Sequence, residues 1–227
     1  MLSQINNGIF SSNTYFYHIA DSNKCFVIDP GLDFDSIYSH LLENALVPVA
    51  VLCTHGHFDH LGSAQLLKNK YECKIYLHEG DLKLSKSANF LLMACKINKR
   101  ILTPVIDNNF SGDVFSAEIE GLNVKWMHVP GHTPGSCFVM IQNLVFTGDT
   151  VYKRAVGLND FPGENKTQLI QSILKVWNVI PDSSHIYPGH GGSDTFGNIK
   201  KYNLPLRSLI GIDCVDTTKL AESFNEK

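Results

Sequence analysis

The chain has little that would mark a secreted or membrane-spanning protein. Its longest apolar stretches, such as Val47 to Cys53, are far too short to cross a bilayer. The first seven residues, Met1 to Asn7, contain neither the positive region nor the apolar region of a signal peptide. We therefore expect a cytoplasmic protein that has no membrane partner.

The chain also lacks any block of basic residues and any paired cysteines. Lys and Arg together number 19 against 22 Asp and Glu, a net charge of −3, so a nucleic-acid partner gains no support and we expect a small-molecule substrate. The six cysteines stand singly, with no C-x-x-C pair, which favours buried, reduced thiols over a disulfide framework. Nothing in the pattern specifies an oligomeric state.

Short apolar runs alternate with helical patterns along the whole chain, which predicts an α/β fold of sheets covered by helices. Residues 1–210 are expected to form one domain, and the polar residues 211–227 a C-terminal tail that we expect to be frayed. The expected strands are Thr14–Ile19, Cys25–Ile28, Val49–Cys53, Lys74–Leu77, Leu122–Val129, Cys137–Ile141, Asn143–Phe146 and His185–Tyr187. The expected helices are Asp35–Asn44, Leu61–Lys70, Asn89–Lys99 and Thr167–Val179.

The strongest chemical signal is a cluster of four residues of metal-binding types within six positions: His55, His57, Asp59 and His60. Neutral imidazole and carboxylate suit Zn²⁺ and similar cations. Four such neighbours cannot all serve one tetrahedral ion, but they can supply two adjacent ions, two residues to each. We expect Gly56 to allow the tight backbone turn that this needs.

Three later segments share one pattern, an apolar strand that ends in a glycine followed by a possible ligand. They lead into His132, Asp149 and His190. Because strand ends collect functional groups at one edge of a sheet, the sequence offers seven ligands that arrive from four strand ends. Six side chains with Asp149 as a bridge would form a site for two divalent metal ions. Zn²⁺ is favoured, and Fe or Mn are also compatible.

These motifs resemble those of the metallo-β-lactamase superfamily, and most closely its glyoxalase II-like (hydroxyacylglutathione hydrolase-like) branch, in a short form without the C-terminal helical domain. The resemblance implies an αββα sandwich with metals at one edge. It also implies that His55, His57 and His132 hold one ion, that Asp59, His60 and His190 hold the other, and that Asp149 bridges them. Asp29 resembles a structural aspartate that braces the metal loops.

The expected reaction is hydrolysis of a thioester by a hydroxide that bridges the two metals, with Asp59 as the catalytic residue that orients it. Related esters or lactones are alternatives, and so is a persulfide dioxygenase that uses a single iron. Asp149 stands where secreted β-lactamases commonly carry Cys, which argues against that activity.

Two departures from the branch weaken the case for glutathione as the carrier: Leu158 replaces a usual Arg, and only 37 residues follow His190. The apolar segment from Asn89 to Ile101 could form part of the core or a lid over the site. Tyr152 could pack or donate to an oxyanion, and the pair Lys153 and Arg154 could be solvated or meet an acidic substrate group.

Overall fold

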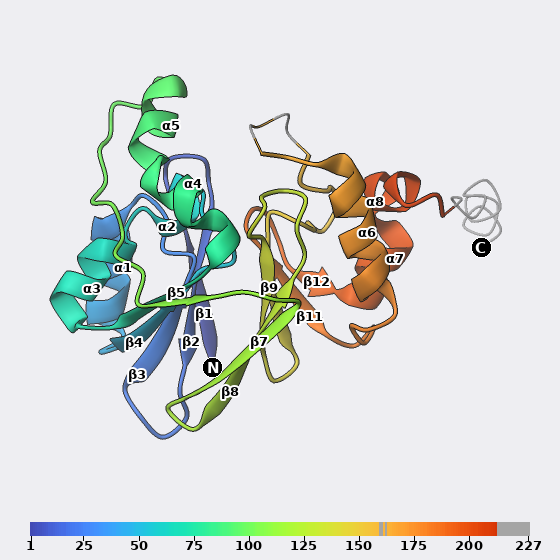
Figure 1. The fold of residues 1–227 in the computed structure, drawn as a ribbon. Helices are drawn as coiled ribbons and strands as arrows, with labels where there is room; N and C mark the ends of the chain where they lie inside the picture. The colour runs from blue at the N-terminus through green and yellow to red at the C-terminus, as the bar shows by residue number, and fades with distance from the viewer. Residues whose placement is uncertain (159–160, 162, 213–227) are drawn as a thin grey trace, which may run out of the picture.

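Two six-stranded sheets face each other between two layers of helices (Figure 1), in a computed structural model that describes residues 1–158, 161 and 163–212. In the first sheet the strands lie in chain order. The three at its start pair antiparallel and the remainder pair parallel. They are β1 (Leu2–Asn6), β2 (Asn13–His18), β3 (Lys24–Ile28), β4 (Val47–Leu52), β5 (Lys74–His78) and β6 (Asn108–Phe110).

The second sheet runs in the order β12-β11-β10-β9-β8-β7 and is antiparallel except where β10 pairs with β11. Its strands are β7 (Val114–Ile119), β8 (Leu122–His128), β9 (Cys137–Ile141), β10 (Leu144–Gly148), β11 (His185–Pro188) and β12 (Asp194–Thr195). This arrangement, with helices outside both sheets, is the expected αββα sandwich.

Helices cover the outer face of each sheet (Figure 1). Over the first sheet lie α1 (Phe34–Glu43), α2 (Phe58–Leu61), α3 (Ala64–Tyr71), the 3₁₀ turn η1 (Glu79–Asp81), α4 (Leu82–Lys86) and α5 (Ala88–Ala94). Over the second lie α6 (Lys166–Trp177), α7 (Phe196–Tyr202) and α8 (Leu204–Leu209).

Strand β3 illustrates why continuous apolar runs suit this fold. Cys25 and Val27 point into the core beneath the helices, whereas Phe26 and Ile28 point into the core between the sheets. Successive side chains of a strand leave on opposite faces, so a strand buried on both faces must be apolar at every position. The chain thus forms three apolar layers, one between the sheets and one beneath each helical layer.

All eight expected strands are present, with ends that differ by at most two residues, but two expected helices are wrong in extent. The helix expected at Leu61–Lys70 is divided into α2 and α3. The one expected at Asn89–Lys99 ends at Ala94, because Lys96 takes a left-handed φ of +58° that stops the helix. The missed strands β1, β6, β7 and β12 are short or half exposed and therefore carry weak periodicity.

Residues 213–227 of the expected tail lie outside the described residues. In the part of the chain that the structure describes, no helix combines the length and apolar character that crossing a bilayer requires. Five cysteines fall within that part, each a free thiol and four of them buried.

Candidate metal centre

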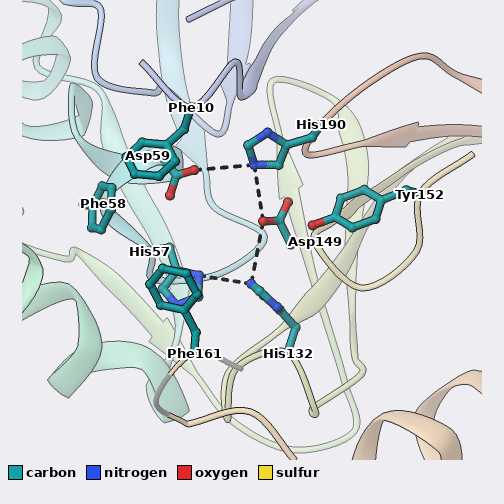
Figure 2. Close-up of a pocket in the computed structure, with 9 residues that line it drawn as sticks. All are labelled: Phe10, His57, Phe58, Asp59, His132, Asp149, Tyr152, Phe161 and His190. Atoms are coloured by element: carbon teal, nitrogen blue, oxygen red, sulfur yellow. Dashed lines mark hydrogen bonds and ion pairs between the residues drawn. The ribbon is translucent and has the colours of Figure 1, made fainter. Parts of the chain in front are cut away.

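The seven residues expected as ligands meet at one edge of the sandwich, where loops from both sheets converge. His55 follows β4 and His132 follows β8, while Asp149 and His190 directly follow β10 and β11. Six of the seven are buried, and the side chain of His190 is 28% exposed. Figure 2 shows five of them around a common cavity.

The histidine half of the site consists of His55, His57 and His132. His57 Nδ1 lies 3.1 Å from His55 Nε2 and 3.0 Å from His132 Nε2. The outer nitrogen of His132 faces the carbonyl oxygen of Gly157 at 3.3 Å and must donate to it, because a carbonyl only accepts. Its Nε2 therefore faces the cavity.

His55 is oriented in the same way. The hydroxyl of Thr54 donates to Asp29 Oδ2 at 2.6 Å and so accepts from His55 Nδ1 at 3.0 Å, which leaves the lone pair of His55 Nε2 facing inward. Three imidazole nitrogens that face one another at hydrogen-bond distance form a donor set that one cation can share. Nitrogen ligands at about 2.0–2.1 Å from one tetrahedral ion stand about 3.3 Å apart, close to the separations found here.

The acidic half consists of Asp59, His60 and His190. His60 Nε2 lies 3.4 Å from His190 Nε2 and 3.5 Å from Asp59 Oδ2. His60 Nδ1 is held at 3.2 Å from the carboxylate of Asp29, so its Nε2 faces the cavity. These three side chains bring ligand atoms within 4.8 Å of one another.

Asp149 lies between the two halves. Its Oδ2 is 3.7 Å from His132 Nε2 and 3.4 Å from His190 Nε2, and its Oδ1 is 3.4 Å from His60 Nε2. Among the described residues, Oδ1 is buried and has no hydrogen-bond partner. A Cβ at Gly189 would lie 2.0 Å from that oxygen, so only glycine fits beside it. A buried carboxylate oxygen that accepts no hydrogen bond and lies among inward-facing imidazoles is the chemistry that a cation satisfies.

The two halves differ in their electrostatics. Burial lowers the pKa of His55 well below its usual range and that of His57 to about 4. Burial also acts to lower the pKa of His60 and His190, but Asp149 and Asp59 outweigh it, so that the pKa of His60 is raised and that of His190 reaches about 9. Burial therefore favours the neutral forms of His55 and His57, whereas the acidic half carries opposite charges.

Asp29 braces the loop that carries four of these residues. It takes a φ of +49° at the end of β3 and accepts hydrogen bonds from the backbone N–H of Thr54 at 2.7 Å and from its hydroxyl at 2.6 Å. Together with its contact to His60, this side chain supports both halves. These are the contacts that the resemblance implied for it.

Asp81, in η1, is a second brace that the sequence reasoning missed. It accepts from the backbone N–H groups of Gly56 at 2.8 Å and Gly135 at 2.7 Å, and from the hydroxyl of Thr133 at 2.7 Å. Gly56 leaves room for this carboxylate, because a Cβ there would approach Asp81 Cβ to 2.9 Å, and its φ is not positive. The available signal was an acidic residue four positions beyond the strand expected at Lys74–Leu77.

A cavity of about 460 Å³ opens over the cluster, and its apolar wall comes from residues that the sequence reasoning did not choose. Phe10, Phe58 and Phe161 form this wall. Tyr152, which the sequence analysis did consider, also lines the cavity, and its hydroxyl points toward Asp149 in Figure 2. The segment from Asn89 to Ile101 is not among the lining residues, and several of its residues line a separate cleft. The alternative of a lid is therefore wrong for this cavity.

Comparison with known proteins places these features in a family. The model of the metallo-beta-lactamase superfamily matches residues 7–190. Hydroxyacylglutathione hydrolase GloC of Haemophilus influenzae is 32% identical over 196 residues, covering 83% of this chain and 90% of the relative.

Two solved structures share the fold closely. BLEG-1 B3 metallo-beta-lactamase has a TM-score of 0.78 at 27% identity, covering 91% of this chain and 99% of that one. TTHA1623 in a di-iron-bound form has a TM-score of 0.78 at 28% identity, covering 89% and 98%.

A histidine and aspartate cluster at the edge of an αββα sandwich defines a metal-dependent hydrolase class, and its donor set indicates divalent metals. The chain belongs to the metallo-beta-lactamase superfamily. Within it, the similarity to GloC agrees with the glyoxalase II-like branch.

Proposed function

We propose that this chain is a hydrolase with two metal ions that cleaves thioesters. The observation that carries the proposal is the convergence of inward-facing histidine nitrogens around Oδ1 of Asp149, which accepts no hydrogen bond. The similarity to GloC, which is named for the hydrolysis of acylglutathione, supports a thioester as the bond that is cut.

The ligands divide between the two halves. His55, His57 and His132 would hold one ion, Asp59, His60 and His190 the other, and Asp149 would contact both. Zn²⁺ is favoured by this donor set, and Fe or Mn also fit it; the related structure in a di-iron form supports iron as a second candidate. When bound, the ions would polarise the scissile carbonyl and lower the pKa of water.

The chain's own residues position the reactants. Burial raises the pKa of Asp59, but His60 and His190 lower it by more, so its carboxylate is ionised at neutral pH and can orient an attacking water. Phe10, Phe58 and Phe161 offer an apolar surface to an acyl group. Tyr152 can donate its hydroxyl toward the carbonyl or the leaving sulfur.

Metal analysis and a substrate panel on one metallated preparation test the proposal. We expect close to two ions per chain, and a kcat/KM for thioesters above that for β-lactams, lactones and phosphodiesters. Binding of at most one ion after reconstitution with Zn²⁺, Mn²⁺ or Fe²⁺ would refute the dinuclear site. A preference for phosphodiesters would overturn the reaction class, and the similarity to BLEG-1 makes a β-lactam the necessary comparison.

A persulfide dioxygenase with a single iron is the second candidate. The compactness of the histidine half, together with Asp149 beside it, favours this alternative, because that half could hold one ion by itself. Oxygen consumption with a persulfide substrate on protein loaded with Fe²⁺ distinguishes the two functions, since hydrolysis consumes no oxygen.

A further inference from the structure

A second cleft adjoins the cavity over the metal centre. It has a volume of about 410 Å³, and we call it the outer cleft. It shares Tyr152 and His190 with the cavity over the cluster. A ligand that reaches past these two side chains therefore passes from one space into the other. The remaining residues that line the outer cleft are Lys153, Arg154, Ala155, Gly191 and Gly192.

Arg154 gives the outer cleft a cation that is available to a ligand. Its side chain is exposed, and the guanidinium lies over the ring of Tyr202 at 5.3 Å from the centroid. Within residues 1–158, 161 and 163–212 it has no carboxylate partner. Stacking on an aromatic ring orients the planar guanidinium and leaves two of its N–H groups able to bind one carboxylate or phosphate in a bidentate manner.

Lys153 has a different role from Arg154. Its Nζ lies 3.2 Å from Asp194 Oδ2 and donates to the carbonyl oxygen of Ser193 at 3.3 Å. This pair fixes the lysine at the rim and offsets much of its charge. Arg154 is therefore the principal anion-binding group, and Lys153 adds to the local positive potential.

Gly192 keeps the outer cleft open. A Cβ on Gly191 or Gly192 would meet no atom within 4 Å. Gly191 takes a φ of +77°, which accounts for glycine there, but Gly192 has no such backbone reason. Neither packing nor backbone geometry among the described residues requires glycine at 192, and a side chain there would project into the space a ligand would use.

We propose that the outer cleft is an anion subsite in which Arg154, with Lys153 beside it, binds a carboxylate or phosphate at the far end of the thiol carrier. The inference rests on the proposed thioesterase function. It fixes the direction of the substrate: the acyl group lies against Phe10, Phe58 and Phe161, and the carrier passes over Tyr152 into the outer cleft.

The test places one acyl group on three carriers: glutathione, which bears carboxylates, coenzyme A, which bears phosphates, and N-acetylcysteamine, which is uncharged. Arg154→Gln removes the charge and keeps much of the volume, and Gly192→Leu fills the cleft. Arg100→Gln is the matched control, because it removes the same charge from an exposed residue of a separate cleft.

We expect Arg154→Gln to lower the ratio of kcat/KM for a charged carrier to that for N-acetylcysteamine by about tenfold, mainly through KM, as for loss of a hydrogen bond to a charged group. Loss confined to glutathione identifies a carboxylate, and loss confined to coenzyme A a phosphate. Gly192→Leu should reduce both bulky carriers, and Arg100→Gln should leave every ratio within twofold. An unchanged ratio for both charged carriers in Arg154→Gln would overturn the proposal.

Calorimetry separates this inference from the proposed function. Free glutathione and free coenzyme A are titrated into the metallated wild-type protein and into Arg154→Gln. If no thioester is hydrolysed but one free carrier binds about tenfold more weakly to Arg154→Gln, the anion subsite stands and the thioesterase function fails. If thioesters are hydrolysed and Arg154→Gln changes neither binding nor the carrier ratio, the subsite fails alone.

Discussion

The histidine half and the acidic half of the centre share the loop after β4 but are stabilised in different ways. In the histidine half, His55 and His132 are oriented through their outer nitrogens by Thr54 and by the carbonyl oxygen of Gly157, and burial is nearly complete. In the acidic half, imidazoles and carboxylates are paired by charge, and His190 is partly exposed. We infer that the histidine half holds its ligands in a fixed arrangement, whereas the acidic half is open to solvent at His190. Substrate would therefore enter on the side of His190.

Asp149→Ala should impair metal binding in both halves and so remove the difference between them. This substitution should have the largest effect of those considered. Because Asp149 contacts His132 on one side and His60 and His190 on the other, metal content should fall below one ion per chain. The loss in kcat/KM should exceed the roughly 100-fold typical of residues that only support a ligand. Elemental analysis and kinetics measure both. Asp113→Ala removes an exposed carboxylate and serves as the control.

Asp59→Ala and His57→Ala should separate the two halves. We expect each variant to retain close to one ion, held in the half that was left intact, because each residue contacts only its own half closely. Asp59→Ala should also lower kcat by about 100-fold or more, since the carboxylate that orients water is lost. Spectroscopy on the Co²⁺-substituted variants would distinguish the remaining sites. Identical spectra from the two variants would contradict the division.

Asp81→Ala should weaken the histidine half selectively. It leaves the buried N–H groups of Gly56 and Gly135 without their acceptor, at a cost of about 1–3 kcal/mol each. We expect a lower Tm and a loss of roughly 10–100-fold in affinity for one ion, with the other ion unaffected. Thr133→Val removes a single donor to the same carboxylate and should have a smaller effect. Equal weakening of both ions in Asp81→Ala would show that the two halves are not braced separately.

The smallest expected effect is on the pH dependence of stability in protein stripped of metal. Because the pKa of His190 is raised to about 9 in the folded state, its contribution to the free energy of unfolding is fully present below about pH 6.5. That contribution is lost as the pH rises through 9. Because the pKa of His57 is lowered to about 4, its neutral burial costs stability as the pH falls from 6.5 toward 4. Urea unfolding should show that His190→Gln flattens only the alkaline side and His57→Gln only the acidic side.

The αββα fold and the family could be predicted from the sequence because their signals are local. Buried strands read as continuous apolar runs, and glycine-flanked ligands follow directly after them, as in Gly148-Asp149 and Gly189-His190. Three of the seven candidate ligands were chosen in this way and four from the cluster at 55–60, and the structure brings all seven to one edge. Their assignment to individual ions stays a prediction.

The residues that the sequence did not reveal act through contacts between distant segments. Asp81 reaches Gly135 across 54 positions, and Phe10 enters the cavity from the turn between β1 and β2. No periodicity or motif marks such residues. A single carboxylate or phenyl ring on a loop looks the same in the sequence whether or not it contacts a distant segment. The helix expected at Asn89–Lys99 was too long for a related reason. Apolar residues continue to Ile97, but the left-handed φ of Lys96 ends the helix before them.

The sequence by itself determined which residues are candidates for metal ligation, because ligation depends on residue type and on strand ends that the apolar pattern marks. Only the tertiary structure decided how these residues are held and approached. Bracing by Asp81, the aromatic wall of the cavity and the exposed cation of Arg154 beside it all depend on which surfaces the two sheets bring together. That packing is a property of the whole chain, since each of these contacts forms only when segments far apart in sequence are buried against one another.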